Sequence, residues 1–307
     1  MNDNNSPTKS WFTTKQNKLF HGLNHMGITG KCYNTFIMVI GMIIASCSIS
    51  SCSKDDDDPT EKGSELNVVV DNNGVANGDH SFTRIDDKNF IIDDIKYTVV
   101  DSVLEVTGYD ETFFKGEAKI INSLNYHGTQ LDVRCIGVNA FNACKTLTAI
   151  FIPQNVTTIK ESAFKNCDAL KTITIISEGL TSIGDFAFYG CSSINSFTIP
   201  NSVVTIGKRS FGECGGLTAV TISNSLTSLA QEAFVGCSSL NAIVIPQGVE
   251  IIGGSAFERC RSLASINIPN RVTLINSNTF EYCTGLTAVT IPSGMKLIGS
   301  CAFYGCI

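Results

Sequence analysis

Cysteine is the residue type in this sequence whose number and spacing could support chemistry. Thiols can pair as disulfides, coordinate metal ions or act as nucleophiles. Thirteen cysteines occur among the 307 residues, and eight of them follow one another at intervals of 23 or 24 residues. These eight are Cys144, Cys167, Cys191, Cys214, Cys237, Cys260, Cys283 and Cys306. Such intervals are much wider than the CxxC-type spacing of common zinc sites.

We interpret these eight residues as a core Cys ladder, with one cysteine in each coil of a repeat. Neighbouring thiols would then lie about 5 Å apart, because adjacent strands are separated by about 4.7–4.9 Å. That separation permits disulfides, but a column of inward-pointing cysteines packs most simply as free thiols. We therefore predict packed free thiols, with disulfides or a metal site as alternatives. Cys135 and Cys301 fall outside the column and are the cysteines expected to react.

The residues around the Cys ladder form a repeat. A phenylalanine stands three residues before each cysteine of the Cys ladder, and we call these residues the ladder phenylalanines. They are Phe141, Phe164, Phe188, Phe211, Phe234, Phe257, Phe280 and Phe303. The units share the template CxxLxxVxIPxxVxxIGxxAFxxC. A fixed period of this length is typical of a solenoid, in which each coil stacks on its neighbours. One coil cannot fold alone, because a few buried side chains at roughly 1.5–3 kcal/mol each do not offset the entropy of ordering a whole coil at about 1–2 kcal/mol per residue.

The pattern of apolar residues within a unit predicts its local structure. Val289 and Ile291 flank a polar threonine, as expected for a half-buried strand. Pro292 then ends the strand, because proline has no N–H to donate to the ladder. Ile298–Gly299 is predicted to be a turn, and Ala302–Phe303 a short helical turn that packs back on the core. The predicted fold class is therefore α/β, with a parallel sheet on one side of a solenoid and short helical turns opposite.

These columns resemble the leucine-rich repeats of BspA-like, Treponema-type surface proteins, whose unit is LxxIxIPxxVxxIGxxAFxxC. The resemblance covers residues 86–307, and Ile136–Gly137 and Ala140–Phe141 fit its first coil. It implies a right-handed solenoid with a concave sheet. Residues 84–144 would form a small β-rich N-terminal cap and a first coil with an inserted turn at Tyr126–Gln130, and residues 145–307 would form seven repeats. It also implies a non-catalytic cell-surface protein used for adhesion, although the motif specifies the ligand poorly.

A ligand is expected on the outward strand positions of the concave sheet. The predicted binding face comprises Phe151, Lys171, Thr174, Asn195, Thr198, Thr218, Thr221, Asn241, Val244, Asn267, Thr287 and Thr290. A flat and almost uncharged face suits an extended protein partner or a hydroxyl-rich glycan, although threonine also suits any solvated strand. The glycan interpretation is the weaker one, because the single tryptophan, Trp11, precedes the predicted mature chain. A passive spacer is the third interpretation.

The N-terminal residues are predicted to be a targeting segment. Lys31 precedes the apolar run 36–45, and the small residues 46–51 follow it, which is the order of a secretory signal peptide. The apolar run is too short to span a membrane. Residues 1–51 are therefore assigned to a signal peptide, with Met26 as the predicted true start.

Two cysteines in this segment are candidate lipid-attachment sites, because the residues before Cys47 and Cys52 resemble the lipobox of bacterial lipoproteins. Cys52 is preferred, since the acidic run 55–58 behind it resembles a tract that directs some lipoproteins of Bacteroides-type bacteria to the outer face of the outer membrane. A lipid would be the only membrane attachment. The acidic run is alternatively a solvated linker, and residues 52–83 are predicted to be an acidic flexible tether.

Charge and motif content argue against nucleic-acid binding and catalysis. The net charge is −6, whereas nucleic-acid binders usually carry a basic patch. No HExxH, GxSxG, GxGxxG or Walker-type run occurs. His80 lies in the predicted tether and His127 in the predicted inserted turn, so both histidines are outside the repeats. We therefore predict no enzyme activity, no metal and no cofactor. The expected partner is an extracellular or host protein of matrix type, with a glycan as the alternative.

The last coil of the sequence ends at Cys306–Ile307 without a polar capping unit. A bare apolar end of a solenoid favours association. We therefore expect that this end pairs with another surface or that the sequence is truncated.

Overall fold

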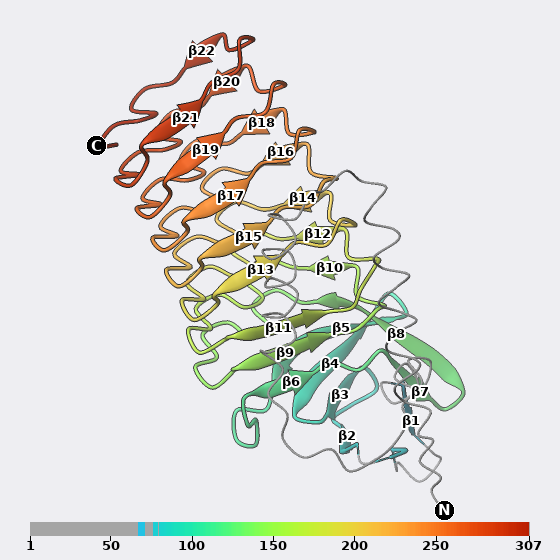
Figure 1. Ribbon diagram of the computed structural model, residues 1–307. Helices are drawn as coiled ribbons and strands as arrows, with labels where there is room; N and C mark the ends of the chain where they lie inside the picture. The colour runs from blue at the N-terminus through green and yellow to red at the C-terminus, as the bar shows by residue number, and fades with distance from the viewer. Residues whose placement is uncertain (1–66, 71–75, 79, 307) are drawn as a thin grey trace, which may run out of the picture. The chain divides into compact units, whose positions relative to one another are not determined.

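Each repeat contributes two short strands, and most of these strands pair with the equivalent strands of neighbouring repeats (Figure 1). The computed structural model describes residues 67–70, 76–78 and 80–306. Within them, the repeats form a parallel β-solenoid of seven coils, which confirms the predicted solenoid. The predicted signal peptide, Met26, Cys47, Cys52 and the acidic run 55–58 lie outside the described residues.

The strands make two ladders on different sides of each coil. The first ladder comes from the predicted strand of each repeat, which a proline such as Pro292 follows in five of the seven coils. Its strands are β9 (Ala149–Ile152), β11 (Thr172–Ile175), β13 (Ser196–Thr198), β15 (Ala219–Thr221), β17 (Ala242–Val244), β19 (Ser265–Asn267) and β21 (Ala288–Thr290). The second ladder comes from the segment predicted as a turn: β10 (Thr158–Ile159), β12 (Ser182–Ile183), β14 (Thr205–Ile206), β16 (Ser228–Leu229), β18 (Ile251–Ile252), β20 (Leu274–Ile275) and β22 (Leu297–Ile298). The second ladder shows that this segment also carries inter-coil hydrogen bonds.

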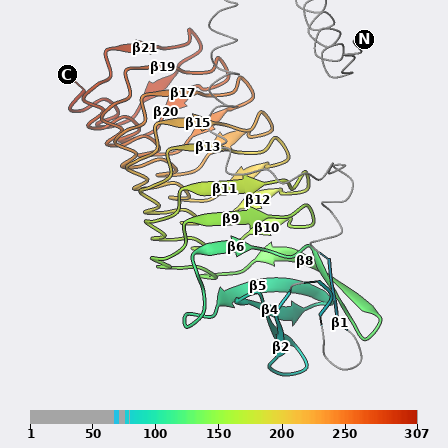
Figure 2. The same ribbon diagram turned by 60° about the horizontal axis from the view of Figure 1, so that its bottom comes forward.

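Upstream of the repeats, the strands are mostly antiparallel (Figure 2). β2 (Phe82–Arg84), β3 (Asn89–Ile92), β4 (Ile95–Val100) and β5 (Val103–Tyr109) pair in sequence order, and β5 then pairs in parallel with β8 (Thr129–Ile136). β8 continues into the second ladder through β10, and β6 (Glu117–Lys119) begins the first ladder beside β9. The Tyr109 ring stacks on Phe141 with the centroids 5.8 Å apart, so it covers the N-terminal end of the phenylalanine column.

The predicted flexible tether, residues 52–83, is partly folded, which corrects its boundary. β1 (Asn67–Val70) pairs in parallel with β7 (Ser123–Tyr126), and β7 forms a hairpin with β8. Val68 is fully buried, and the Ser123 hydroxyl donates a hydrogen bond to Asn67 Oδ1 at 2.8 Å. The polar residues around Val68 concealed this strand in the sequence, because its burial depends on β7, which lies more than fifty residues further along the chain.

The side of each coil that carries the ladder phenylalanine forms no helix within the described residues, so the helical turns of the α/β prediction are not confirmed. The described residues contain no helix, and none of their segments is therefore a helix able to cross a membrane. Residues at positive φ stand two positions before and two after each ladder phenylalanine; around Phe188 these are Phe186 (φ 55°) and Gly190 (φ 71°). Because residues at positive φ stand on both sides of Phe188, its backbone N–H points out of its own coil. This N–H donates to the Ser210 carbonyl of the next coil at 2.8 Å. Inter-coil bonds thus replace the i→i−4 bonds of a helix.

The ladder phenylalanines form a continuous stack through the core. Successive ring centroids lie between 5.1 and 5.6 Å apart, with the ring planes within 13° of parallel. These separations fall in the range that favours aromatic contacts. The phenylalanines from Phe141 to Phe280 are completely buried. Rings of the two neighbouring coils therefore cover each phenylalanine inside the stack.

One core position carries an unsatisfied hydroxyl and gives a stability prediction. Ser210 occupies the position before a ladder phenylalanine, it is fully buried, and its Oγ has no hydrogen-bond partner. An unpaired buried polar group costs about 1–3 kcal/mol. We expect Ser210→Ala to raise the free energy of unfolding by about 1 kcal/mol, measured by urea denaturation followed by circular dichroism.

Thr279 provides the matched control for Ser210, because it occupies the same position three coils further on and is equally buried. Its Oγ1 donates to the Asn276 carbonyl at 2.8 Å. Thr279→Ala should therefore lower the free energy of unfolding. A loss of stability in Ser210→Ala as well would contradict the assignment of an unsatisfied hydroxyl.

Candidate binding surface

The Cys ladder is a column of hydrogen-bonded free thiols in this structure. The cysteines from Cys144 to Cys283 are buried and Cys306 is half-buried, and all are free. From Cys167 onward, each Sγ donates to the carbonyl of the ladder phenylalanine in the preceding coil, at 2.9–3.3 Å. That carbonyl also accepts the backbone N–H of the cysteine in its own coil, as in Cys167 N to Phe164 O at 3.2 Å. The position requires a small apolar side chain that donates one hydrogen bond, and cysteine meets each requirement.

The electrostatics of the Cys ladder favour the neutral thiol. Burial raises the pKa of Cys167, Cys214 and Cys283 to about 12. Burial also raises the pKa of Cys191, Cys237 and Cys260 well above the ordinary thiol value. The thiolate is the form that attacks electrophiles and binds metals, so these ladder thiols are poorly suited to either task at neutral pH. Within the described part of the chain, no group of three or more Cys, His, Asp or Glu side chains could hold a metal ion.

The two cysteines outside the ladder lie in different environments. Cys301 is exposed, whereas Cys135 is half-buried on β8. Burial raises the pKa of Cys135, and the nearby Lys160 ammonium opposes that shift. Lys160 is itself paired with Glu105, with Nζ and Oε2 2.5 Å apart. Of the two, Cys301 is the better candidate for reaction with external reagents.

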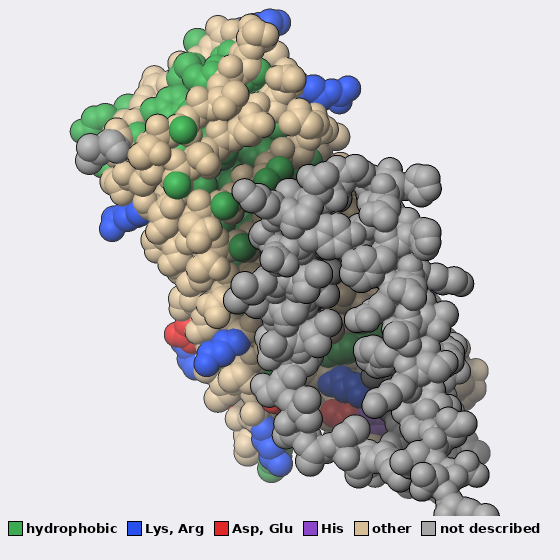
Figure 3. Space-filling view, in the orientation of Figure 1, with side chains coloured by type: hydrophobic (Ala, Val, Ile, Leu, Met, Phe, Trp, Pro, Cys, Tyr) green, Lys and Arg blue, Asp and Glu red, His purple; other side chains and the backbone are tan. Residues whose placement is uncertain are grey.

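The structure brings the predicted binding face together on the outer side of the first ladder. Eleven of its twelve residues are exposed, and Phe151 is half-buried. The exposed residues are Lys171, Thr174, Asn195, Thr198, Thr218, Thr221, Asn241, Val244, Asn267, Thr287 and Thr290. Ladder pairing keeps equivalent residues in register, as for Thr198 with Thr221 and Thr221 with Val244. Lys171 is the only charged residue of the twelve. In the part of this side that Figure 3 leaves uncovered, the blue and red side chains lie mostly at the edges.

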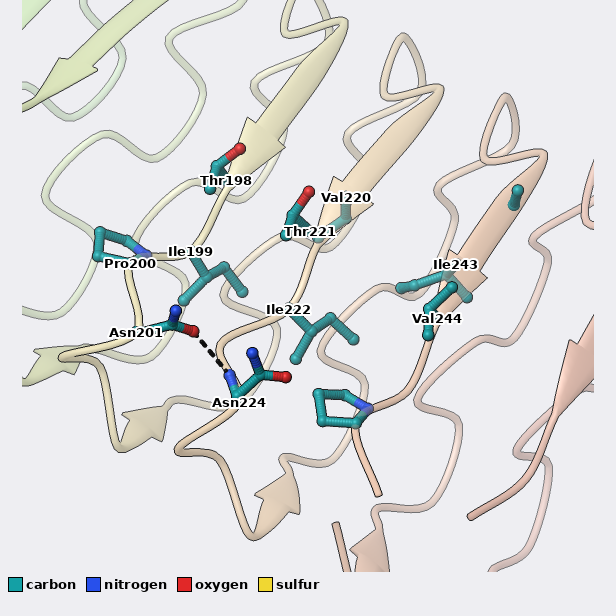
Figure 4. A pocket seen from close by; sticks show the side chains of 12 residues that line it. Thr198, Ile199, Pro200, Asn201, Val220, Thr221, Ile222, Asn224, Ile243 and Val244 are labelled. Carbon is teal, nitrogen blue, oxygen red and sulfur yellow. Dashed lines mark hydrogen bonds between the residues drawn. The ribbon is translucent and has the colours of Figure 1, made fainter. Parts of the chain in front are cut away.

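A groove crosses this face at the C-terminal ends of β13, β15 and β17. It has a volume of about 400 Å³. Thr198, Thr221 and Val244 line it on the strand side, and Pro200 and Pro246 line it where the chain leaves the strands (Figure 4). The exposed fraction of Val244 is 81%, so the groove offers an aliphatic side chain beside hydroxyl groups. This composition can bind a polar, uncharged chain that also carries apolar side chains.

Sequence reasoning missed the two asparagines that line this groove. The Asn224 backbone N–H donates to Asn201 Oδ1 at 3.0 Å, which links neighbouring coils (Figure 4). In the coil of Asn224, Ser223 replaces the proline that ends the strand in the coil before. Ser223 is buried, and its hydroxyl donates to the Val203 carbonyl at 2.8 Å. A repeat alignment could have found both asparagines, since they directly follow the strand-ending position.

The fold and this face define a repeat protein of the leucine-rich class, in which stacked coils present one extended surface. The chain belongs to the family described as the BspA type leucine rich repeat region, whose model matches residues 109–240 and 204–307 in six copies. The resemblance predicted from the sequence is therefore confirmed. No functionally curated protein matches the sequence.

Solved structures with a similar fold come from several bacteria. A leucine-rich cell surface protein from Faecalibacterium prausnitzii is 25% identical, with 72% of this chain and 75% of that chain covered and a TM-score of 0.51. The pneumococcal vaccine antigen PcpA is 18% identical, with 74% and 68% covered and a TM-score of 0.55, which shows the fold alone. A leucine-rich repeat protein of T. pallidum is 27% identical, with 69% and 86% covered and a TM-score of 0.48.

The burial of the thiols gives a prediction for chemical labelling. In the native protein at pH 7.5, iodoacetamide should alkylate Cys301 first among the cysteines that the structure describes, because Cys301 is exposed. The cysteines of the ladder from Cys144 to Cys283 should react only on unfolding. Mass spectrometry of the alkylated protein identifies the labelled positions, and Cys301→Ser is the control. Rapid labelling of Cys237 in the native protein would contradict the burial of the Cys ladder.

The raised thiol pKa values also predict loss of stability at alkaline pH. The unfolded chain releases its thiol protons near pH 8.5, whereas the folded chain retains them up to about pH 12 at Cys167, Cys214 and Cys283. Stability is thus fully present below about pH 8.5 and falls as the pH rises toward 12, by about 1.4 kcal/mol per pH unit for each such thiol. Urea unfolding at several values between pH 8 and 10 measures this slope.

Cys237→Ala provides the control for the alkaline slope, because the pKa of Cys237 is raised well above its ordinary value by burial. The variant should have a lower free energy of unfolding than the unsubstituted protein at neutral pH. Its free energy of unfolding should fall less steeply as the pH rises. An unchanged slope would mean that the thiols are not responsible. Burial also raises the pKa of Tyr97, so the comparison is made below pH 10, where tyrosine in the unfolded chain remains largely protonated.

Proposed function

We propose that this chain is a lipid-anchored protein of the outer membrane, facing the cell exterior, that binds an extracellular or host protein through the outer side of its first ladder. The observation that carries the proposal is the predicted binding face, because its exposed residues lie in register across successive coils and are almost uncharged. Repeat proteins use such extended surfaces to contact large partners.

The composition of the face supports a protein partner more than a glycan. Aromatic rings are the usual stacking platform for sugars, and Phe151, the one aromatic residue of the face, is half-buried. Val244 and the groove beside it instead offer aliphatic surface next to the hydroxyls of Thr198 and Thr221. Aliphatic surface next to hydrogen-bonding groups matches a polypeptide, which carries both apolar side chains and backbone amides.

The membrane location is part of the same proposal and rests on the sequence. Acylation at Cys52, with Cys47 as the alternative, would leave the repeats outside the membrane and free to meet a partner. The similar Faecalibacterium prausnitzii protein is a cell surface protein, which supports this location. Globomycin treatment of cells that produce the chain should accumulate the unprocessed precursor, and the Cys52→Ala variant should lose the lipid.

A binding experiment tests the function. The full chain should bind saturably to a member of a panel of immobilised matrix proteins, and Thr221→Lys should abolish that binding because it places a charge in the groove. Thr205→Lys is the matched control, since Thr205 is equally exposed but lies on β14 of the second ladder. Circular dichroism confirms that both variants fold.

The outcomes separate the three interpretations of the face. Binding to proteins that Thr221→Lys removes and Thr205→Lys retains supports the proposal. Binding only to polysaccharides, with competition by free sugars, would replace it with glycan capture. Absence of binding across both panels would favour a passive spacer.

A further inference from the structure

The first ladder is interrupted between β11 and β13. β11 pairs with β9 and β13 pairs with β15, and among the described residues no backbone hydrogen bond joins β11 to β13. On the second ladder the same two coils stay joined, because β12 pairs with β14. They also stay joined on the side that carries the ladder phenylalanine, where the Phe188 backbone N–H donates to the Ser210 carbonyl. The two coils are therefore hydrogen-bonded on two sides, but on the side of the first ladder they are not. The separation of β11 and β13 in Figure 1 illustrates this.

Two features of the sequence account for the break. Phe197 stands where the neighbouring coils have isoleucine or valine, and its ring packs between Phe188 and Phe211 with centroid distances of 5.1 and 4.8 Å. The preceding coil is also one residue longer, since 24 residues rather than 23 separate Cys167 from Cys191. A larger core side chain and a longer turn both displace β13 from β11.

The break uncovers apolar side chains and opens a cavity. Ile173 and Ile175 on β11 are half-buried, although their register partners on β9, Ile150 and Ile152, are only 2% and 0% exposed. A cavity of about 390 Å³ lies here, lined by both isoleucines of β11 and by Ser196, Phe197, Thr198 and Pro200. The facing edges of the two strands retain backbone groups without a strand partner, and such edges readily pair with another extended chain.

Unpaired charges bracket the break. Lys171 directly precedes β11, and Glu178 lies three residues after its end. Both are exposed, and neither forms an ion pair within the described residues. A cation at one end and an anion at the other complement a segment with an acidic residue at one end and a basic residue at the other.

The other interruptions of the ladders lack this combination. Between β17 and β19, Ala264 still donates its N–H to the Asn241 carbonyl at 3.4 Å, and Ile243 and Ile245 stay 7% and 2% exposed. Between β14 and β16, Ile206 and Leu229 are likewise buried. Only at β11 and β13 do missing ladder bonds, uncovered isoleucines and unpaired charges coincide within the described coils.

We propose that the break between β11 and β13 binds an extended peptide segment of the partner protein. The backbone of the segment bonds to the free strand edges, and alternate apolar side chains contact Ile173 and Ile175. An acidic residue pairs with Lys171, and a basic residue about six to seven positions away pairs with Glu178, since a strand rises about 3.3 Å per residue. This inference deepens the proposed function and rests on it.

A peptide selection on the purified full chain tests the proposal. Random nine-residue linear peptides displayed on phage are selected, and the enriched peptides are synthesised. We expect alternating apolar residues flanked by one acidic and one basic residue. N-methylation of alternate backbone amides should raise Kd at least tenfold, because it removes the backbone donors. Thr174→Arg and Thr198→Arg should each raise Kd at least tenfold. Thr205→Arg, an exposed change on β14 of the second ladder and outside the binding face, should alter Kd less than twofold.

A charge exchange provides a readout that misfolding cannot mimic. Lys171→Glu should weaken the peptide with the acidic residue, and a peptide with lysine in that place should restore the binding. The proposal is overturned if no peptide is enriched, or if the enriched peptides tolerate N-methylation or both arginine variants.

The two proposals fail in distinguishable ways. A matrix protein whose binding is lost in Thr221→Lys but unchanged in Thr174→Arg would uphold the proposed function and refute the peptide site. If neither peptides nor matrix proteins bind the folded full chain, both proposals fall.

Discussion

The structure depends on one constraint, which is that a coil cannot satisfy all of its hydrogen bonds or cover its core side chains without its neighbours. Each ladder phenylalanine shows this on both counts. The Phe188 ring stacks on Phe164 and Phe211, its N–H donates to the Ser210 carbonyl, and its own carbonyl accepts the Cys214 thiol. A residue that departs from the repeat therefore disturbs two coils, and the fixed spacing of Phe and Cys follows from this mutual dependence.

The Cys ladder shows how a reactive residue type becomes structural. A serine at the same position could donate the same hydrogen bond, but burying its more polar hydroxyl costs more than burying a thiol. An alanine would leave the phenylalanine carbonyl with one partner fewer. The spacing that first suggested disulfides or metal sites is thus the coil period itself, and the hydrogen bond to the preceding coil explains why cysteine occupies the position.

Both proposals rest on places where the repeat is imperfect. The outer side of the first ladder is nearly uniform, so its threonines alone give little specificity. Phe197 and the extra residue before Cys191 break that uniformity, and they do so without opening the second ladder. Val244 and Ser223 are further departures, and both lie at the groove on the same face or beside it. The binding interpretations accordingly concentrate on the coils from β11 to β17.

The sequence by itself determined the coil period, the buried columns and the outward positions, because burial in a solenoid repeats with the chain. Eleven of the twelve predicted face residues are exposed for this reason. Tertiary structure alone decided the backbone of the phenylalanine side and the folding of β1. Positive φ at Phe186 is not a preference of phenylalanine, and the hydrogen bonds to the next coil maintain it. The break between β11 and β13 was equally hidden, because it depends on how the Phe197 ring fits between two other rings.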